Sequence, residues 1–293
     1  MLGSPGVVTE GLIALLTSSP RIAFLDIDGT IVDHDESIAD STVEAIRSAR
    51  ARGHLVFIST GRSAPEVYPW IREIGFDGEI TAGGGFVERA GDLIVEQTMP
   101  ERLVEEITEL LKALDLDYYL QSHQGVEPHG RVAERLDEVL VAHGAAAPSQ
   151  HAVARIFADN RMHGRGEVAK AVFIGDSQED FGRVEAAVHG ELRDAVDLIT
   201  GTIAYLGSAS GEISPRGVNK GTAILRALDH LGLDPAQAIG IGDSRNDVEM
   251  LRICGVGIAM AGAAPEVVAA ADEMTSGVMD GGVWNAFRRH QLI

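Results

Sequence analysis

The sequence predicts an α/β fold, with a parallel sheet as its core and a second, inserted α+β domain. Short apolar runs end at clusters of Asp, Gly, Ser or Thr, and helical periodicity fills the stretches between them. Apolar strands without polar alternation are what a parallel sheet buried on both faces requires. A change of pattern between residues 99 and 212 indicates the insertion.

Three apolar runs define the expected sheet. They cover residues 21–28, 54–58 and 238–242, and each leads directly into a polar cluster. Consecutive parallel strands need a crossover connection between them, usually a helix. In such sheets a ligand binds beyond the carboxyl ends of the strands, which is where these polar clusters lie.

Two helices connect the runs. The segment Ser41-Thr-Val-Glu44 is a capping box, which predicts a helix start at Ser41 and an end near Gly53. A second helix is predicted from Asn219 to Leu231, and Gly232 would end it. Both are βα connections of the kind that a parallel sheet needs.

The stretch from residue 99 to 212 has a different pattern of apolar residues. Helical patterns at 103–114 and 132–140 alternate with strand-like runs at 117–121, 169–174 and 198–206, while 143–158 is expected to be a loop and weak strand. We therefore expect four segments: an N-terminal extension (1–20), a first core part (21–98), an inserted domain (99–212) and a second core part (213–293).

Composition limits the partners. Lys and Arg total 24 against 44 Asp and Glu, a formal net charge of −20, which argues against nucleic acid and anionic membranes. The single cysteine, Cys254, cannot close an internal disulfide. The short apolar stretch at 11–16 lacks a preceding basic region, and the longest apolar run is too short to span a bilayer. A cytoplasmic protein is expected.

The strongest motif is Asp26-Ile27-Asp28-Gly29-Thr30, at the end of the first apolar run. Strand alternation would place the side chains of Asp26 and Asp28 on one side, close together. Two like charges at short range favour a shared proton or a divalent cation. A carboxylate can also attack phosphorus as a nucleophile. The alternative is a simple turn after a strand.

Two further elements point to an anion. Thr60-Gly61-Arg62 follows the second run, where a hydroxyl and free backbone N–H groups can hold a phosphate oxygen, although a turn with a helix N-cap also uses such residues. Lys220 opens a predicted helix, where the macrodipole prefers negative charge, so an anion is expected nearby. The alternative for Lys220 is a solvated side chain.

A fourth cluster follows the run at 238–242. It reads Gly242-Asp243-Ser-Arg-Asn246-Asp247 and offers oxygen ligands without His or Cys, which favours a hard cation, Mg²⁺ over Ca²⁺. A dinucleotide fingerprint is discounted, because Arg245 occupies the position of its third glycine. A similar stretch, Phe173-Ile-Gly-Asp176-Ser, precedes Lys220, and we interpret it as a strand and helix start of the inserted domain.

Together these motifs resemble those of the haloacid dehalogenase (HAD) superfamily of phosphohydrolases, and the large insertion resembles the cap of its Cof-type branch (subfamily IIB, C2 cap). The resemblance runs from Arg21 to the C-terminus. It implies a Rossmannoid parallel-sheet core with an inserted α+β C2-type cap. One departure is Gly83-Gly84-Gly85, where the family usually has an Asn-Gly-Ala-like turn.

The resemblance also implies roles for the motif residues. Asp26 would be the nucleophile and a Mg²⁺ ligand. Asp28 would give the metal its backbone carbonyl and act as general acid and base. Asp243 would be the third metal ligand, and Lys220 would neutralise Asp26.

The same resemblance implies a set of residues that would bind the substrate. Thr60, Gly61 and Arg62, together with Lys220, would hold the phosphoryl group. Asn246 would order the substrate, with Asp247 in support.

The implied activity is that of a Mg²⁺-dependent phosphoric monoester hydrolase, a monomer or homodimer. It would act on small phosphorylated metabolites, with sugar phosphates as the expected class, through an aspartyl-phosphate. A phosphomutase and a non-catalytic phosphometabolite-binding protein remain alternatives, although a pure binder has no need for both aspartates. In the cap, Gln121, His123 and His129 are candidates for contacting the leaving group. The alternative is that they are exposed loop residues without such a role.

Overall fold

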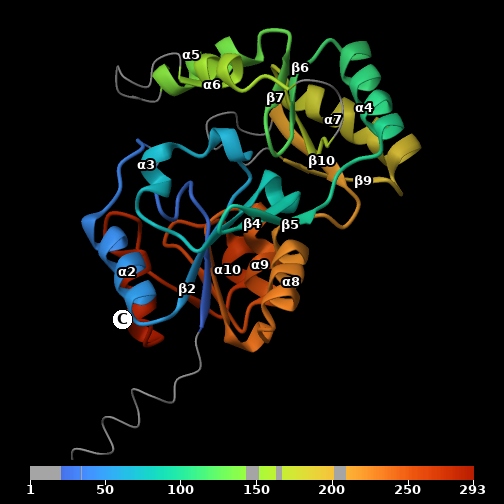
Figure 1. Ribbon diagram of the computed structural model, residues 1–293. Coiled ribbons are helices and arrows are strands. Elements are labelled where there is room, and N and C mark those ends of the chain that lie inside the picture. The colour runs from blue at the N-terminus through green and yellow to red at the C-terminus, as the bar shows by residue number, and fades with distance from the viewer. Residues whose placement is uncertain (1–20, 34, 143–151, 163–166, 201–208) are drawn as a thin grey trace, which may run out of the picture.

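The computed structural model describes residues 21–33, 35–142, 152–162, 167–200 and 209–293 (Figure 1). The chain forms two bodies, each built on its own sheet. No helix within these described ranges is long and apolar enough to cross a membrane. The expected N-terminal extension at 1–20 lies outside the described residues.

The larger sheet has eight strands in the order β13-β12-β11-β1-β2-β3-β4-β5. Their bounds are β1 (Ile22–Leu25), β2 (Leu55–Ser59), β3 (Gly78–Thr81), β4 (Phe86–Arg89), β5 (Asp92–Glu96), β11 (Ala238–Gly242), β12 (Val256–Ala259) and β13 (Glu273–Met274). Neighbours from β13 to β3 pair in parallel, as predicted. The hairpin of β4 and β5 adds two antiparallel strands at one edge.

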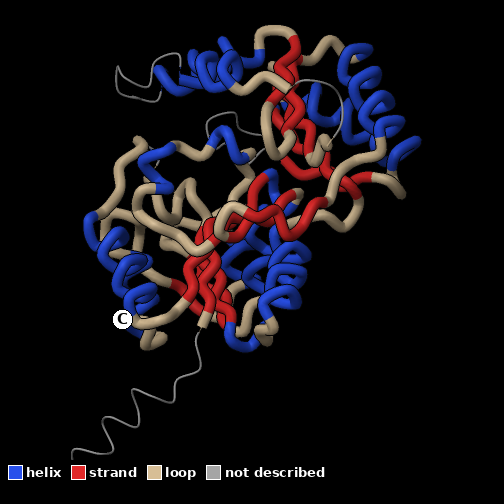
Figure 2. The backbone as a smooth tube through the Cα atoms, viewed as in Figure 1, coloured by secondary structure: helices blue, strands red, loops and turns tan. Residues whose placement is uncertain are grey.

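Helices cover both faces of this sheet (Figures 1 and 2). One face carries α2 (Asp40–Ala51), α3 (Pro69–Arg72) and α11 (Gly282–Arg289), and the other carries α8 (Lys220–Leu231), α9 (Val248–Ile253) and α10 (Pro265–Ala270). Strand β1 shows why its sequence has no polar alternation. Ala23 and Leu25 pack on the first layer and Ile22 and Phe24 on the second, and all four are fully buried.

The helix ends confirm one prediction and correct another. The side chain of Asn219 caps α8, and Gly232 follows its last turn in the left-handed conformation, with φ 66°. The capping box at Ser41 was wrong: α2 begins one residue earlier, at Asp40, and its N-cap residue Ala39 has no side chain that could cap.

The smaller sheet is antiparallel, in the order β7-β6-β8-β10-β9. Its strands are β6 (Asp117–Gln121), β7 (Val126–His129), β8 (Lys170–Ile174), β9 (Val196–Thr200) and β10 (Ser210–Pro215). Helices α4 (Glu101–Ala113) and α7 (Gln178–Ala187) cover one face, and α5 (Val132–Ala142) and α6 (Ala152–Asp159) lie over the other. This is the α+β body expected between the core motifs.

Two details of this body differ from expectation. The segment 143–158 contains α6 from Ala152 onward, so a loop and weak strand was wrong there, while 143–151 lies outside the described residues. Strand β9 ends at Thr200, and the rest of the run expected to reach 206 is also outside them. The chain leaves the small sheet at Pro215, and the segment boundaries at 99 and 212 stay a prediction.

The smaller body, called the cap below (β6 to β10 with α4 to α7), lies over the carboxyl edge of the large sheet (Figure 1). Lys170 of β8 donates to the carbonyl of Gly61, just after β2, at 2.6 Å. Arg245, just after β11, donates to Thr200 of β9 at 3.0 Å. Strand β1 lies between β2 and β11, so these two contacts stand on either side of its carboxyl end.

Candidate active site

Three of the predicted site residues directly follow neighbouring strands. Asp26 comes after β1, Thr60 after β2 and Asp243 after β11. The backbone N–H of Asp26 donates to the carbonyl of Ile241 at 3.0 Å, which continues the pairing of β1 with β11 by one residue. The sheet therefore brings these three motifs to a single edge, as expected for parallel strands.

The fourth motif residue, Lys220, joins the cluster from the first position of α8. Its ammonium lies 2.7 Å from Oδ1 of Asp26 and 2.6 Å from Oδ1 of Asp247, and the side chain is fully buried. These two carboxylates are the anions expected beside a lysine at a helix start. Burial alone would lower the pKa of Lys220, but the charges of Asp247 and Asp26 raise it above its usual range.

Asp247 is fully buried and fixed on both oxygens. While Oδ1 binds Lys220, Oδ2 accepts from the backbone N–H groups of Asp243 at 3.1 Å and Ser244 at 3.0 Å. A Cβ at Gly242 would stand 2.6 Å from that same Oδ2. The glycine at the end of β11 thus leaves the room that Asp247 occupies.

Asp243 is positioned by the loop after β1. Oγ1 of Thr30 donates to its Oδ1 at 3.1 Å. Gly29 has φ +84°, and a Cβ on it would meet the Asp243 carboxylate, 2.7 Å from Oδ1. Sequence reasoning assigned no role to Thr30, although the residue stands in the quoted motif.

Negative charge accumulates at this edge. Burial raises the pKa of Asp26 well above its ordinary range, and the charge of Asp247 adds to that while Lys220 opposes it. Burial and the charge of Asp247 raise the pKa of Asp243 to about 7. Three carboxylates share one ammonium, so the cluster lacks positive charge when all three ionise.

The donor set fits a hard divalent cation. Carboxylate oxygens of Asp26, Asp243 and Asp247 lie within 4.8 Å of one another, with no His or Cys among them. Asp247 already uses both oxygens, whereas Asp26 uses Oδ1 for Lys220 and Asp243 uses Oδ1 for Thr30. Oδ2 of Asp26 and Oδ2 of Asp243 are therefore the carboxylate atoms best placed to ligate a cation.

The Asp28 carboxylate lies outside this acidic group, but its charge, after burial and the charges of Asp247 and Asp243, adds to the raised pKa of Asp26. Strand β1 ends at Leu25, so strand alternation no longer governs the side chains beyond it. The Asp28 carboxylate is half exposed and accepts from Arg62, from Nε at 2.9 Å and from Nη2 at 2.7 Å. The guanidinium expected to bind substrate is thus engaged with Asp28.

The other predicted substrate-binding residues lie around this centre. Thr60 is buried, and its Oγ1 accepts from the N–H of Arg62 at 3.1 Å, which leaves the hydroxyl proton for an acceptor. The Gly61 carbonyl accepts from Lys170 of the cap, a residue that sequence reasoning missed. Oδ1 of Asn246 accepts from the hydroxyl of Ser244 at 2.9 Å.

The cap candidates separate into two groups. Gln121 and His123 lie where cap meets core: Gln121 donates to Glu66 at 2.7 Å, and the His123 ring is 3.1 Å from the Glu88 carboxylate. His129 instead stacks on the ring of Tyr118, which packs toward α4 and α7. The first two could contact a ligand held at this edge, and His129 could not.

The stretch from Phe173 to Ser177, whose sequence is similar to the cluster after β11, does not contribute to the candidate active site. It forms the end of β8 and the start of α7, as predicted. Asp176 is largely exposed and pairs with Arg135 at 2.8 Å. Among the described residues, the acidic group able to hold a metal does not include it.

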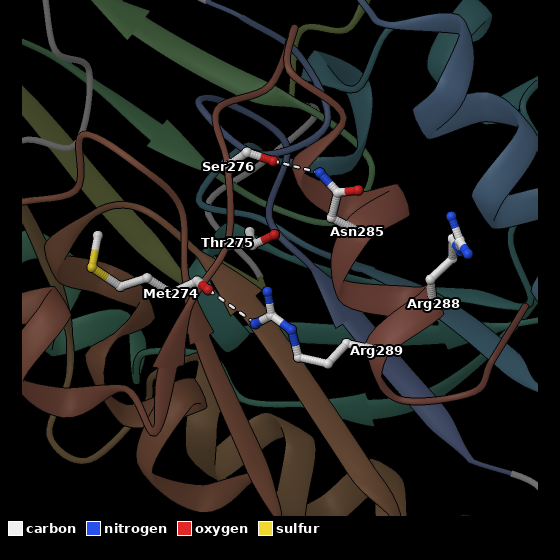
Figure 3. A pocket seen from close by; sticks show the side chains of 6 residues that line it. All are labelled: Met274, Thr275, Ser276, Asn285, Arg288 and Arg289. Carbon is white, nitrogen blue, oxygen red and sulfur yellow. Dashed lines mark hydrogen bonds between the residues drawn. The ribbon is translucent and has the colours of Figure 1, made fainter.

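Figure 3 shows a separate, shallow pocket between β13 and α11. Some of its polar groups already have partners: Asn285 donates to the Ser276 hydroxyl at 2.7 Å, and Arg289 donates to the Met274 carbonyl at 3.1 Å and to Glu273 at 2.8 Å. The residues lining it contribute no carboxylate. It offers none of the chemistry found at the carboxyl edge of β1.

Comparisons with known proteins agree with this arrangement. The chain is 28% identical over 276 residues to the Bacillus subtilis protein named "Putative phosphatase YkrA", covering 93% of this chain and 98% of that protein. It is 26% identical over 249 residues to the HMP-PP phosphatase of Serratia proteamaculans, covering 84% and 86%. The solved structure of the HAD subclass IIB sugar phosphatase BT4131 shares the fold, with TM-score 0.74, 21% identity and coverage of 93% and 100%. The family model for haloacid dehalogenase-like hydrolases matches residues 23–287, and the chain belongs to that family.

Proposed function

We propose that the protein is a Mg²⁺-dependent phosphatase that hydrolyses small phosphorylated metabolites, sugar phosphates in particular, through an aspartyl-phosphate on Asp26. The observation that carries this proposal is the buried ammonium of Lys220, which touches Asp26 and Asp247 beside a third carboxylate, Asp243. A cation on Asp26 and Asp243 would complete a compact positive site for a phosphate ester. Two phosphatase-named relatives support the reaction class.

The site's own residues supply most of the binding. The Thr60 hydroxyl donates to a phosphoryl oxygen, and the Lys220 ammonium neutralises both the nucleophile and the transferring group. Asp26 and Asp243, with the backbone carbonyl of Asp28, would hold Mg²⁺, which would supply further positive charge to the phosphoryl oxygens. Positioning and charge compensation are what phosphoryl transfer requires from a protein.

The proposed reaction has two steps. An oxygen of Asp26 forms a bond to phosphorus while the bond from phosphorus to the leaving oxygen breaks, and Asp28 gives its proton to that oxygen. Water then attacks the phosphorus of the aspartyl-phosphate while the bond from phosphorus to the Asp26 oxygen breaks, Asp28 takes a proton from the water, and inorganic phosphate leaves. Asp28 ends protonated and Asp26 ends as the free carboxylate, as both began. The cycle therefore requires one oxygen of Asp28 to leave Arg62 and take up a proton, because both oxygens accept from the guanidinium in the structure.

The substrate class and the cellular location belong to the same proposal. BT4131, which shares this fold, is described as a sugar phosphatase, and the leaving group here would lie under a cap with polar side chains. A cytoplasmic location fits an enzyme of phosphorylated metabolites whose only cysteine, Cys254, is buried and unpaired.

The test is a panel of phosphorylated metabolites assayed for phosphate release with Mg²⁺, with EDTA and with Asp26→Asn. We expect release that depends on both the metal and Asp26. Activity that survives both changes contradicts the mechanism. Isomerisation of a hexose phosphate without release would instead identify a phosphomutase, and binding without turnover would identify a binding protein.

A further inference from the structure

The pair of Arg62 and Asp28 is attached to a short turn of the core, called the 63–66 turn below. It is a single turn of 3₁₀-helix, η1 (Ala64–Glu66), with Ser63 as its N-cap residue. Nη1 of Arg62 donates to the carbonyl of Glu66 at 3.0 Å, while Nε and Nη2 of the same side chain donate to Asp28. A guanidinium is planar and rigid, so the position of the Glu66 carbonyl helps to set the plane in which Asp28 is held.

The carboxylate of Glu66 binds both the turn and the cap. Its Oε2 accepts from the N–H of Ser63 at 2.9 Å, from the hydroxyl of Ser63 at 2.5 Å and from Nε2 of Gln121 on β6 at 2.7 Å. Ser63 and Gln121 are 0% and 1% exposed, so water does not compete for these bonds. Glu66 is therefore the residue whose backbone holds Arg62 and whose side chain is held by the cap.

A second side chain of β6 lies beside the same carboxylate. Burial, and after it the charge of Glu66, raises the pKa of Tyr119 well above its ordinary range, so its hydroxyl stays protonated. Tyr119 and Gln121 are two residues apart on the strand and share one face. The cap thus meets the 63–66 turn with two side chains that favour an ionised acceptor at Glu66.

The turn is also held from the core side. Nη2 of Arg72 on α3 donates to the carbonyl of Ala64 at 2.8 Å, and Nη1 donates to the carbonyl of Val67 at 3.1 Å. Neither bond uses the carbonyl or the carboxylate of Glu66, which stay with Arg62 and the cap. A single helical turn has little stability of its own, because its first hydrogen bond must fix several dihedral angles. The position of the turn therefore depends on these outside contacts.

The proposed reaction makes the anchoring of Arg62 important. One oxygen of Asp28 must leave the guanidinium to carry a proton, and the other can then keep a single hydrogen bond to it. A carboxyl group held at one point keeps its place only if the donor itself does not move. The ring of Tyr68, 4.8 Å from Cζ, supports a face of the guanidinium, and the Glu66 carbonyl supports its edge.

We propose that Glu66 is a positioning residue for the general acid. Its carboxylate, bound by Gln121 of the cap, fixes the 63–66 turn, and the turn holds Arg62 so that Asp28 is directed at the leaving oxygen. Loss of this contact weakens proton transfer and leaves Thr60 and Lys220 in place. The inference rests on the proposed phosphatase activity and adds a residue to which sequence reasoning assigned no role.

The test uses two substrates that differ in their need for a general acid. Benzyl phosphate and p-nitrophenyl phosphate each carry one aromatic ring, but the benzyl alkoxide is a far stronger base than p-nitrophenolate and depends much more on protonation. The ratio kcat/KM covers the steps up to departure of the leaving group, in which Asp28 acts as the acid. For Glu66→Ala, we expect kcat/KM to fall about 10-fold more with benzyl phosphate, because general acid catalysis contributes about 100-fold or more and misalignment forfeits part of it.

Three further variants separate positioning from cap attachment. Glu66→Gln should recover most of the loss, because an amide oxygen can accept from Ser63 and Gln121 as Oε2 does. Gln121→Met removes the donor of the cap and should produce the same difference between substrates, smaller in size. Thr200→Val is the matched control: it removes another core–cap hydrogen bond, from Arg245, without touching the 63–66 turn, and should leave the ratio between substrates unchanged.

Two outcomes among these variants would overturn the proposal. Equal losses on both substrates in Glu66→Ala would show that Glu66 only attaches the cap to the core. An unchanged ratio between substrates in Gln121→Met would show that the cap does not act on the general acid through Glu66.

A double-mutant cycle tests whether Glu66 acts through Arg62. In the Arg62→Ala background, Glu66→Ala should cause no further change in the ratio between substrates. A full additional change there would contradict the proposed route. If the wild-type protein hydrolyses both esters but no Glu66 variant changes the ratio, the positioning role fails and the phosphatase proposal stands. If neither these esters nor the metabolite panel release phosphate with Mg²⁺, the phosphatase proposal itself fails.

Discussion

Arg62 holds the carboxylate of Asp28 with two parallel hydrogen bonds, from Nε at 2.9 Å and from Nη2 at 2.7 Å. The guanidinium is itself fixed, because Nη1 donates to the Glu66 carbonyl at 3.0 Å and Cζ lies 4.8 Å from the centre of the Tyr68 ring. A two-point pair of this kind orients a carboxylate as well as balancing its charge. We therefore expect Arg62 to act on the proposed general acid rather than directly on the phosphoryl group.

The first prediction concerns this pair. Arg62→Ala should lower kcat by about 10- to 100-fold and change KM little, because it disorders Asp28 and leaves Thr60 and Lys220 in place. Steady-state kinetics with p-nitrophenyl phosphate measures the split. Arg62→Lys, which cannot form the two-point contact, should recover only part of kcat. A large rise in KM at constant kcat would instead show that Arg62 binds the substrate directly.

The second prediction tests the fit between Gly29 and Asp243. Gly29→Ala should raise the Mg²⁺ concentration needed for half-maximal activity, because its methyl group would displace the Asp243 carboxylate. Gly91→Ala is the matched control: Gly91 has φ +89°, close to the +84° of Gly29, but a Cβ there meets nothing within 4 Å. Both variants carry similar backbone strain. If the Gly29→Ala and Gly91→Ala variants need the same Mg²⁺ concentration, the close approach of Gly29 to Asp243 plays no role in binding the metal.

The third prediction concerns the buried ammonium. Lys220→Met should abolish measurable turnover and reduce the free energy of unfolding by about 3–5 kcal/mol, because it leaves Asp26 and Asp247 buried without their partner. Without added cation, the loss should be smaller at pH 5 than at pH 8, because burial already raises the pKa of Asp26, and without the opposing charge of Lys220 that carboxyl would take up a proton more readily. Urea denaturation at both pH values measures it. A pH-independent loss would contradict this origin.

The fourth prediction follows from the raised pKa of Asp243, about 7 against an ordinary value of 3.8. In the metal-free protein the folded state then binds more protons than the unfolded state between about pH 4 and pH 7. Relative to Asp243→Asn, the wild-type protein should be most stable below that window and lose its advantage as the pH rises through it.

Added Mg²⁺ should reverse that trend, because it replaces the proton as the counter-charge. The increase in Tm on adding Mg²⁺ should grow from pH 5 to pH 8 and should be small in Asp243→Asn. Thermal unfolding with Mg²⁺ and with EDTA measures both effects. An increase that is the same at every pH, or that persists in the variant, would place the cation elsewhere.

The carboxyl edge could be predicted because its residues follow local rules. Asp26, Thr60 and Asp243 each come directly after a buried apolar strand, and parallel strands bring such positions together. The helix of Lys220 is bounded by Asn219 and Gly232, whose capping is encoded locally. These predictions needed no knowledge of distant contacts.

What failed depends on tertiary contacts or on weak local signals. Arg62 and Asp28 are 34 residues apart and meet because the chain turns after Leu25. Lys170 is a single lysine opening an apolar strand, and its partners Gly61 and Glu212 belong to different segments.

The hairpin of β4 and β5 was also missed. It turns on Ala90 and Gly91, both with positive φ, and alanine gives no turn signal. The helix α6 was missed because the segment 143–158 contains Pro148 and Ser149 before its apolar residues.

The central claim is that Asp26 becomes phosphorylated during turnover. We would mix the enzyme with excess p-nitrophenyl phosphate and Mg²⁺, quench in the steady state and reduce with borohydride, which converts an acyl phosphate to an alcohol. Peptide mass spectrometry should find the reduced side chain at position 26, and only with substrate and metal present. Reduction at another carboxylate, or at none while phosphate is released, would contradict the account.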